Sequence, residues 1–575
     1  MKSIKNIFAA GLLVSAMGLG MTSCIGDLDV TPSDPNTLTW ADVEKNPDLY
    51  LPELLGKCYA ELAVSGQGGA GSSDISGLDN GTSCYSRAIF MLNEFPTDEA
   101  LWIYQDAGII DLVTGTWARG NVNIYGTYSR LYVAIAVCND YIRNLNSSGI
   151  DMTSPTAVNC AAQYKLEARA IRALSYWYVL DLFGNGGWVD DTMNYGDNPT
   201  PITRRDLYDK LVTELKDIIA SWPANLPTIY GRVGLDGVKA LLAKVYLNAS
   251  VYTNGEVNGY QDCLGLCNEI IANHQGGGFQ GSGLANHYLA LFSANNDRYM
   301  PGGSKSDENE ILWGVPYEGT YTQSYGGSTF LVAAAVTNNG DADVFSMKSG
   351  DYGAEKFNWK CMHARSQFSD KFTDSGDVRD DFWSKESNGF QKENTIFNEF
   401  SNGYASVKFT NLLTNDDGTF PLVDQSKGTV ISNIAESAKV NNVYSFADTD
   451  LPIFRLADIY LMRAECRIVG GVGNDAEALA GLNYVRERAG ASKWNSIGAV
   501  STNELLNERA RELYWENHRR TDLVRFNRFV SNYTWSWKGN VANGTDLGSY
   551  MNVFPIPSNV IAAQPEFEAY QNKGY

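Results

Sequence analysis

The sequence predicts a mostly α-helical protein in which paired helices support a large loop-rich half that bears aromatic side chains. Helical periodicity runs through residues 25–275 and returns over 451–575, whereas Gly, Asn, Ser, Asp and aromatic residues dominate 276–450. The chain has 575 residues, 44% of them apolar, which is enough for a large buried core. A content of 12% aromatic residues argues against disorder in the irregular stretch, and long ordered loops are usually functional.

The first 23 residues have the features of an export signal. Lys2 and Lys5 precede an apolar run from Ile7 to Gly20 that is too short and wrongly flanked to be a membrane-spanning helix. Small residues directly before Cys24 are typical of a bacterial lipoprotein cleavage site, which predicts lipidation of Cys24; ordinary secretory cleavage is the alternative. We therefore expect contact with a membrane through a lipid anchor only.

The mature chain is acidic. Its net charge of −21 becomes −23 without the first 23 residues, which carry Lys2 and Lys5 and no acid (−21 − 2 = −23). Nucleic acid is therefore excluded as a partner, because phosphate binding needs a basic surface. Cys263 and Cys267 are four residues apart, a spacing that suits neither a redox pair nor a zinc site, and the chain has only 4 His. We expect mostly buried thiols and no required cofactor.

In the N-terminal part, helical segments follow one another at lengths that suit antiparallel pairs with short connections. In one of them Ile171, Leu174, Tyr178 and Leu182 share a face, and the sequence GNGG ends it. A Gly/Ser-rich loop at 66–81 separates the first helix from the rest. The predicted helices span 42–64, 125–145, 157–183, 204–219 and 235–250.

A turn with two large rings lies within this part, in the sequence EFPTDEALWIY. Residues before Pro96 favour extended geometry, and Thr97 and Asp98 favour turns. We therefore expect Trp102 and Tyr104 on a loop or at its edge, with burial in the core as the alternative for both rings.

The C-terminal part resumes the helical pattern. In LPIFRLADIYLMRAEC, Ile453, Leu456, Tyr460 and Ala464 repeat at helical spacing. Further helices are expected at 475–488 and 502–517. Helix pairs of this size are what tetratricopeptide-like repeats use, although the usual repeat signature is not clean here.

Four segments, in order behind the export signal, match one known family: EARAIRALSYWYVLDLFG (167–184), LPIFRLADIYLMRAE (451–465), ERARELYWENHRRTDLVRF (508–526) and FPIP (554–557). Together they resemble the SusD/RagB family of surface glycan-binding lipoproteins over essentially the whole mature chain. The resemblance implies a SusD-like fold, in which four tetratricopeptide-like helix pairs support a sugar-binding half. The implied organisation is a signal peptide at 1–23 and one domain at 24–575, made of a scaffold with the glycan loop (25–275), a loop-rich insertion (276–450) and a second scaffold (451–575).

The segment 508–526 is rich in charge. We expect most of its Arg and Glu residues to lie on the solvated face of an amphipathic helix and to form surface pairs of small worth. Its role by resemblance is in the scaffold.

The resemblance is closest to the family's starch-binding founding member and implies a sugar site. Its three stacking rings correspond to Trp102, Tyr325 in SYGGSTF and Trp359 in WKCMHAR, and its polar contacts correspond to Asp79 and Arg87. Sugars bind with pyranose faces on aromatic rings and hydroxyls on carboxylate, amide and guanidinium groups. An arc of three rings suits a helical α-1,4-glucan, so we expect starch and maltooligosaccharides as ligands.

The family pattern is broken at Ala107, which stands where the founding member has an Asn that binds the sugar. Gln105 and Asp106 are the candidates to replace that contact.

A structural calcium ion is the one metal that the resemblance implies, near the acidic loop at 295–297, with Asp297 as the candidate ligand. Asp307, Glu308 and Glu310 are further oxygen donors, and a solvated acidic loop without metal is the alternative.

The resemblance also implies a partner and a location. The partner is a SusC-like TonB-dependent outer-membrane transporter. Asp27 and Asp29 follow Cys24 and resemble the surface-export signal of Bacteroidota lipoproteins, so the expected location is the outer membrane of a Gram-negative cell, facing outward. Other glycans such as dextran or fructan, or glycopeptide cargo, are the alternative ligands. A glycoside hydrolase would need two carboxylates about 5–10 Å apart, and we expect a binding protein rather than an enzyme.

Overall fold

The computed structural model describes residues 39–152, 161–224, 228–336, 352–353, 358–380, 383, 389–393, 398–415 and 446–575. Cys24 and the export signal lie outside these ranges. Across the described ranges, no helix combines the length and the apolar character needed to cross a membrane.

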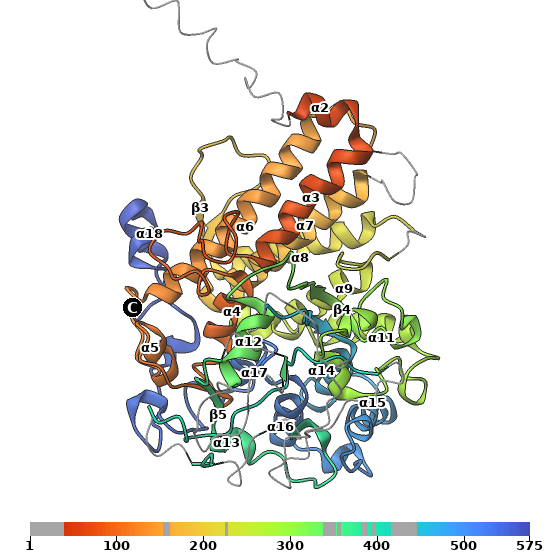
Figure 1. Cartoon of the computed structure of the whole chain (residues 1–575), viewed down its shortest axis with the longest axis vertical. Helices are drawn as coiled ribbons and strands as arrows, with labels where there is room; N and C mark the ends of the chain where they lie inside the picture. The colour runs from red at the N-terminus through yellow and green to blue at the C-terminus, as the bar shows by residue number, and fades with distance from the viewer. Residues whose placement is uncertain are drawn as a thin grey trace, which may run out of the picture.

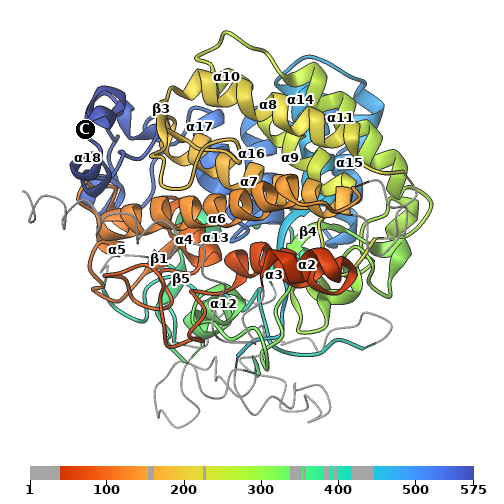
Figure 2. The same cartoon turned by 90° about the horizontal axis from the view of Figure 1, so that it is seen from above.

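Helices that follow one another in the chain pack side by side, as the sequence predicts (Figures 1 and 2). In this row α6 contacts α7, α7 contacts α8, α8 contacts α9, α9 contacts α11, and α11 contacts α14, which contacts α15. The bounds in the N-terminal part are α2 Trp40–Lys45, α3 Pro47–Ala63, α4 Tyr85–Asn93, α5 Ile109–Thr114, α6 Val122–Ser147, α7 Ala161–Tyr178, α8 Arg204–Ser221, α9 Leu235–Leu247, α10 Ala249–Tyr252 and α11 Tyr260–His274.

The ends of these helices have local causes. The helix predicted over 42–64 is broken between α2 and α3, where Asn46 leaves helical geometry and Pro47 begins the next helix. Beyond α7, the helix continues as a π-helical turn at Val179–Phe183. It ends at Gly184, whose φ of 72° favours glycine.

Three short antiparallel strand pairs connect distant parts of the chain. They are β1 Ala100–Trp102 with β5 Met362–Ala364, β2 Gly186–Trp188 with β3 Thr200–Ile202, and β4 Ile311–Val315 with β6 Leu451–Arg455. The prediction of a helix from 451 is wrong for its first five residues, which form β6. Ile453 therefore lies in a strand paired to β4, and the helix α14 begins only at Leu456.

The irregular stretch contains a helix that the sequence pattern does not predict. In α12, Gly327–Ala335, every residue is buried, so the segment GSTFLVAAA has no polar face from which a helical period could be read. Its other described elements are short: 3-10 turns at Tyr288–Phe292, Asn296–Tyr299, Ser306–Glu308 and Val378–Asp380, and α13 at Ser366–Ser369.

The C-terminal helices are α14 Leu456–Ile468, α15 Asp475–Arg488, α16 Thr502–Leu513, α17 Arg519–Arg525 and α18 Ser558–Ala563. Helix α15 has the predicted bounds, and α16 starts as predicted but ends four residues early. Trp515 and Asn517 have φ values of 61° and 68°, which no helix accommodates.

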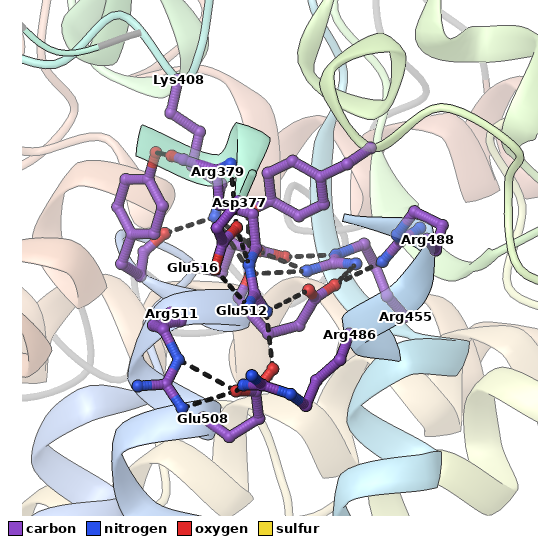
Figure 3. A network of polar contacts seen from close by, with 12 residues as sticks. Asp377, Arg379, Lys408, Arg455, Arg486, Arg488, Glu508, Arg511, Glu512 and Glu516 are labelled. Carbon is purple, nitrogen blue, oxygen red and sulfur yellow. Dashed lines mark hydrogen bonds and ion pairs between the residues drawn. The ribbon is translucent and has the colours of Figure 1, made fainter. Parts of the chain in front are cut away.

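The expectation that segment 508–526 lies on a solvated face is wrong, because its charges are buried in an ion-pair network (Figure 3). Arg455 contacts Glu310 at 2.6 Å, Glu512 at 3.0 Å and Glu516 at 2.7 Å. Arg488 contacts both Glu310 and Glu512 at 2.6 Å. These guanidinium groups join β6, α15 and α16, so the charges of the segment bind helices together in the interior.

The described cysteines are buried free thiols, as expected: Cys58, Cys84, Cys138, Cys263, Cys267, Cys361 and Cys466. The Sγ atoms of Cys263 and Cys267 are 3.9 Å apart on successive turns of α11.

Candidate functional site

The five predicted ligand residues come from four separate segments that meet around α12. Arg87 lies on α4 and Asp79 in the loop before it. Trp102 is the last residue of β1, Trp359 comes three residues before β5, and Tyr325 comes two residues before α12. Figure 2 shows α4, β1, β5 and α12 gathered on one side of α6.

Strand pairing brings the two predicted tryptophans together. Trp102 is in register with Met362, and the Ile103 amide donates to the Cys361 carbonyl oxygen at 2.8 Å. The Trp359 amide donates to the Ala333 carbonyl oxygen at 2.8 Å, which fixes this residue to the end of α12. Backbone hydrogen bonds therefore set the separation of the two rings.

A ring that the sequence analysis missed lies between them. Phe330 of α12 stacks on Trp102 with ring centroids 5.7 Å apart, and its other neighbour Trp359 is 6.4 Å away. The angle between ring planes is 27° in the first pair and 47° in the second, so the three rings lie on a curve. The available signal was that Phe330 ends the motif SYGGSTF, in which Tyr325 alone is given a ring contact by the resemblance.

Arg87 lies against all three rings. Its guanidinium carbon is 4.5 Å from the Phe330 centroid, 5.6 Å from that of Trp102 and 5.9 Å from that of Trp359. The side chain is 6% exposed, Nε is buried without a hydrogen-bond partner, and no carboxylate within the described ranges forms an ion pair with it. Burial lowers the pKa of Arg87, and the negative charge of Asp79 partly opposes this. The site thus contains a desolvated cation that is stabilised mainly by ring faces.

Gly81, in the loop before α4, lies next to both Arg87 and the backbone of Tyr325. Asp79 belongs to the same loop as Gly81. A methyl group at Gly81 would lie 2.5 Å from Arg87 Nη1 and 2.8 Å from the Tyr325 carbonyl oxygen. Only glycine therefore allows these two segments to approach. Asp79 is exposed and Tyr325 is half-buried, so both are at the outer edge of the cluster.

The predicted loop position of Trp102 is wrong, because the residue is in a strand and only 2% exposed. Phe95 and Phe330 lie 5.4 Å and 5.7 Å from its ring, and its Nε1 donates to Asp106 Oδ2 at 2.7 Å. Trp359 is half-buried. Trp102 therefore packs against Phe330 as part of the core. Direct contact between Trp102 and a sugar stays a prediction.

Tyr104 is the accessible ring of this stretch, with 38% of its surface exposed. It meets Trp102 edge-on at 6.1 Å and Phe400 at 5.5 Å, and Lys360 Nζ lies 5.2 Å from the Phe400 ring. The resemblance assigns no sugar contact to Tyr104.

The two candidates to replace the missing Asn differ in availability. Asp106 accepts a hydrogen bond from the Trp102 indole at 2.7 Å, whereas Gln105 is exposed and, among the described residues, donates only to the Ile103 carbonyl oxygen at 3.4 Å. Gln105 is therefore the better placed of the two.

The turn that precedes β1 is buried and rigidly held. Asp98 accepts from Arg519 at 2.6 Å and from Tyr533 at 2.7 Å. Arg365 donates to the carbonyl oxygens of Ala100 at 3.0 Å and Val113 at 2.9 Å. Because these contacts reach the C-terminal part of the chain, the turn and the rings behind it are fixed to the scaffold.

Two carboxyl groups of this turn interact. Glu94 and Glu99 are both fully buried, and burial raises the pKa of Glu94 well above its ordinary value. Burial also raises the pKa of Glu99, to about 7, against the opposing effect of Arg519. The pair therefore holds a proton in the folded protein at mildly acidic pH.

The residues near the acidic loop do not fit a calcium ion. Glu310 is paired with Arg455 and Arg488 at 2.6 Å, and Glu308 accepts from the Asn286 amide at 2.8 Å. The Asn295 side-chain oxygen accepts from the Thr414 amide at 3.0 Å, which leaves Asp297 exposed without companion ligands. Within the described ranges no group of three or more His, Cys, Asp or Glu could hold a metal.

Comparisons with known proteins agree on one family. A model of the SusD family matches residues 241–575. The starch-binding protein SusD of Bacteroides thetaiotaomicron is 31% identical over 600 aligned residues, covering 100% of this chain and 99% of that protein. A solved SusD homolog of the same species superposes with a TM-score of 0.67 at 18% identity, covering 94% of this chain and 99% of that one. Surface glycan-binding protein A of that species, solved with laminarihexaose, gives 0.62 at 17% identity, covering 91% and 99%.

Proposed function

Because the chain belongs to the SusD family, we propose that it binds starch-like α-glucans at the cluster of Arg87, Trp102, Tyr325, Trp359 and Asp79. Its general role follows from the family: it is a non-catalytic, surface glycan-binding protein. The choice of α-glucan and the assignment of these residues are the proposal.

One observation carries the assignment. Of the residues matched one at a time to a starch-binding relative, Arg87, Trp102 and Trp359 lie together around Phe330, and Gly81 brings the Tyr325 backbone next to Arg87. These residues are spread over nearly 300 positions of the chain (79 to 359). The choice of an α-glucan rests on the resemblance, because Trp102 and Phe330 are buried and leave Trp359 and Tyr325 as the ring surface of the cluster. Half-buried Trp359 and Tyr325 and exposed Tyr104 offer ring surface, while Asp79, Gln105 and the edge of Arg87 offer groups that bind hydroxyls.

The partner and the anchor extend the proposal. A lipid on Cys24 would hold the protein at the outer membrane, and a SusC-like TonB-dependent transporter would receive the bound glycan. We expect dissociation constants in the micromolar to millimolar range, about −4 to −8 kcal/mol, because a site open to solvent with a few stacking contacts binds weakly.

Affinity electrophoresis tests the ligand. The purified protein is run in gels that contain amylopectin, dextran, levan, xylan or laminarin. Retardation by amylopectin is expected, and retardation by another polymer without any effect of amylopectin contradicts the α-glucan assignment.

Variants test the site. Trp359→Ala removes a stacking ring worth about 0.5–1.5 kcal/mol, so binding should fall about 2- to 10-fold. Trp102→Ala is the poorer variant, because loss of a buried ring destabilises the fold as well. If Trp359→Ala and Arg87→Met both bind as the parent does, the glycan site is elsewhere.

A further inference from the structure

A groove of about 390 Å³ lies on the helical scaffold, outside the ring cluster. It is lined by side chains of α3, α6 and the segment between β2 and β3: Lys57, Ala136, Val137, Asn139, Asp140, Arg143, Val189 and residues 194–197. Figure 2 places β3 and α12 on opposite sides of α6. Thr127 of α6 contacts α4, and Asp140 is 140 − 127 = 13 residues further along, so the groove is about 20 Å along the helix from the ring cluster.

Tyr195 stands at this groove as a fixed, exposed ring. It is 67% exposed, yet its hydroxyl donates to Asp140 Oδ1 at 2.6 Å and accepts from Asn144 Nδ2 at 3.1 Å. The Arg143 guanidinium carbon lies 4.3 Å from the ring centroid. An exposed tyrosine on a loop normally moves among rotamers, so these contacts reduce the entropy that a ligand would have to remove.

The loop that carries the ring is itself closed. The Asn194 amide donates to Asp197 Oδ2 at 2.8 Å, the Asp197 amide donates to the Asn194 carbonyl oxygen at 3.2 Å, and Gly196 takes the left-handed φ of 87° that the turn requires. Tyr195 is therefore presented by a rigid turn.

The groove also offers groups that bind hydroxyls. Asp140 uses Oδ1 for the Tyr195 hydroxyl, and within the described ranges its Oδ2 has no partner. Neither Lys57 nor Arg143 forms an ion pair with a described residue; the Arg143 guanidinium has only the Asp190 carbonyl oxygen at 3.4 Å as a described acceptor. The floor between them includes the apolar side chains of Ala136, Val137 and Val189.

We infer that this groove is a second binding site for neutral sugar units, with Tyr195 as its stacking ring and Asp140 and Arg143 as its hydroxyl partners. The inference rests on the proposed function in that it takes the ligand to be a glycan. Its volume is in the range of small-molecule sites. The mixture of acidic and basic groups favours an uncharged ligand, and an acidic protein does not attract anionic polymers.

A second site would act through avidity. Once one stretch of a polymer is held at the ring cluster, another stretch meets the groove at a high effective concentration. A groove with low affinity can therefore increase the retention of a polymer and contribute little to the binding of a short oligosaccharide.

The test compares Tyr195→Ala, Trp359→Ala and the double variant in gels of whichever polymer retards the parent. Tyr550→Ala is the matched control, because Tyr550 is exposed (39%) and does not line the groove. Retention should fall about 2- to 10-fold in Tyr195→Ala, further in the double variant, and not in the control. Equal retention of Tyr195→Ala and Tyr550→Ala overturns the inference.

The outcomes separate the two proposals. If only Trp359→Ala loses retention, the ring cluster stands and the groove falls; if only Tyr195→Ala loses it, the groove stands and the ring cluster falls. If no polymer retards the parent, both fall.

Hydrogen exchange locates the contact directly. With a saturating oligosaccharide of the polymer that retards the parent, which is maltoheptaose where that polymer is amylopectin, amides of 189–197 should gain protection in the parent and in Trp359→Ala, but not in Tyr195→Ala. Absence of protection in the parent overturns the inference even if retention changes.

Discussion

Two regions of the molecule bury arginine in opposite ways. In the network of Figure 3, Arg455 at the end of β6 and Arg488 at the end of α15 both contact Glu512 of α16. Both also contact Glu310, and Arg455 contacts Glu516 beyond the end of α16. Arg87, which is as buried as many of them, forms no ion pair with a described residue and lies against three rings.

The difference indicates what each charge is for. A buried charge costs several kcal/mol of desolvation, and nearby opposite charges recover that cost only in good geometry. In the network, ion pairs within the protein offset the desolvation cost, so these charges hold the scaffold together. The desolvation cost of Arg87 is offset less, because ring faces are weaker partners than carboxylates. A hydroxyl-bearing ligand could supply the missing hydrogen bonds, and this supports the proposed placement of the binding site at Arg87.

Loss of one network acid should have the largest effect. Glu512→Gln removes one of the two carboxylates that Arg455 and Arg488 share, and removal of one member of a buried pair costs about 3–5 kcal/mol of unfolding free energy. Urea denaturation measures this. Glu504→Gln, at the partly exposed edge of the network, should cost at most about 1 kcal/mol. Equal losses in the two variants would contradict the structural role of the interior pairs.

Arg87→Met should show the reverse pattern. A methionine removes the desolvated charge while filling similar space, so the free energy of unfolding should be unchanged or higher. Glycan binding should fall about 10-fold or more, since hydrogen bonds from charged donors are worth about 1.5–3 kcal/mol. Denaturation and calorimetry with maltoheptaose check the two halves of this prediction. A large loss of stability would show that Arg87 belongs with the structural charges.

The turn that precedes β1 and the ion-pair network should respond to pH with opposite signs. The pKa of Glu99 is raised to about 7, so the folded state holds a proton that the unfolded state releases; this contribution is full below about pH 4.5 and is lost as pH rises to 7. The Arg455 and Lys408 charges lower the pKa of Glu516 to about 2, so its contribution is full above about pH 4.5 and is lost as pH falls to 2.

Glu99→Gln should therefore flatten the decline of stability between pH 4.5 and 7. Denaturation midpoints of parent and variant across that range measure the difference. Parallel curves would mean that the proton is held elsewhere.

The smallest effect is expected at Tyr104. Tyr104→Ala removes an exposed ring at the edge of the cluster, so binding should weaken about 2-fold with stability unchanged. Calorimetry resolves this, with Tyr550→Ala as the control. If Tyr104→Ala binds glycan as the parent does, Tyr104 makes no sugar contact, and Trp359 and Tyr325 are the remaining ring contacts of the proposed site.

The sequence predicted those features that are encoded locally. Helix α15 begins after Asn474 and α16 after Ser501, whose side chains accept hydrogen bonds from the first amides of each helix. Strand β6 escaped prediction because its five residues run directly into α14 and share its apolar period. Helix α12 escaped because it has no polar face.

The site was predicted as a set of residues but not as an arrangement. The burial of Trp102 depends on Phe330 and β5, more than 200 positions away, and no local pattern reports such a contact. Likewise, alternating Arg and Glu over 508–526 have the pattern of a solvated helix; only the packing of Glu310, Arg455 and Arg488 against them makes them interior charges.

The attachment of Trp359 to α12 has a mechanical consequence. The amides of Trp359, Lys360 and Cys361 donate to the last carbonyl oxygens around the end of α12, and the next residues continue into the pairing of β5 with β1. If a glycan binds at Trp359 as proposed, tension on that glycan acts on several backbone hydrogen bonds at once. The segment would have to detach from the end of α12 and from β1 at the same time. Under tension, the glycan should therefore dissociate from the protein before the site deforms.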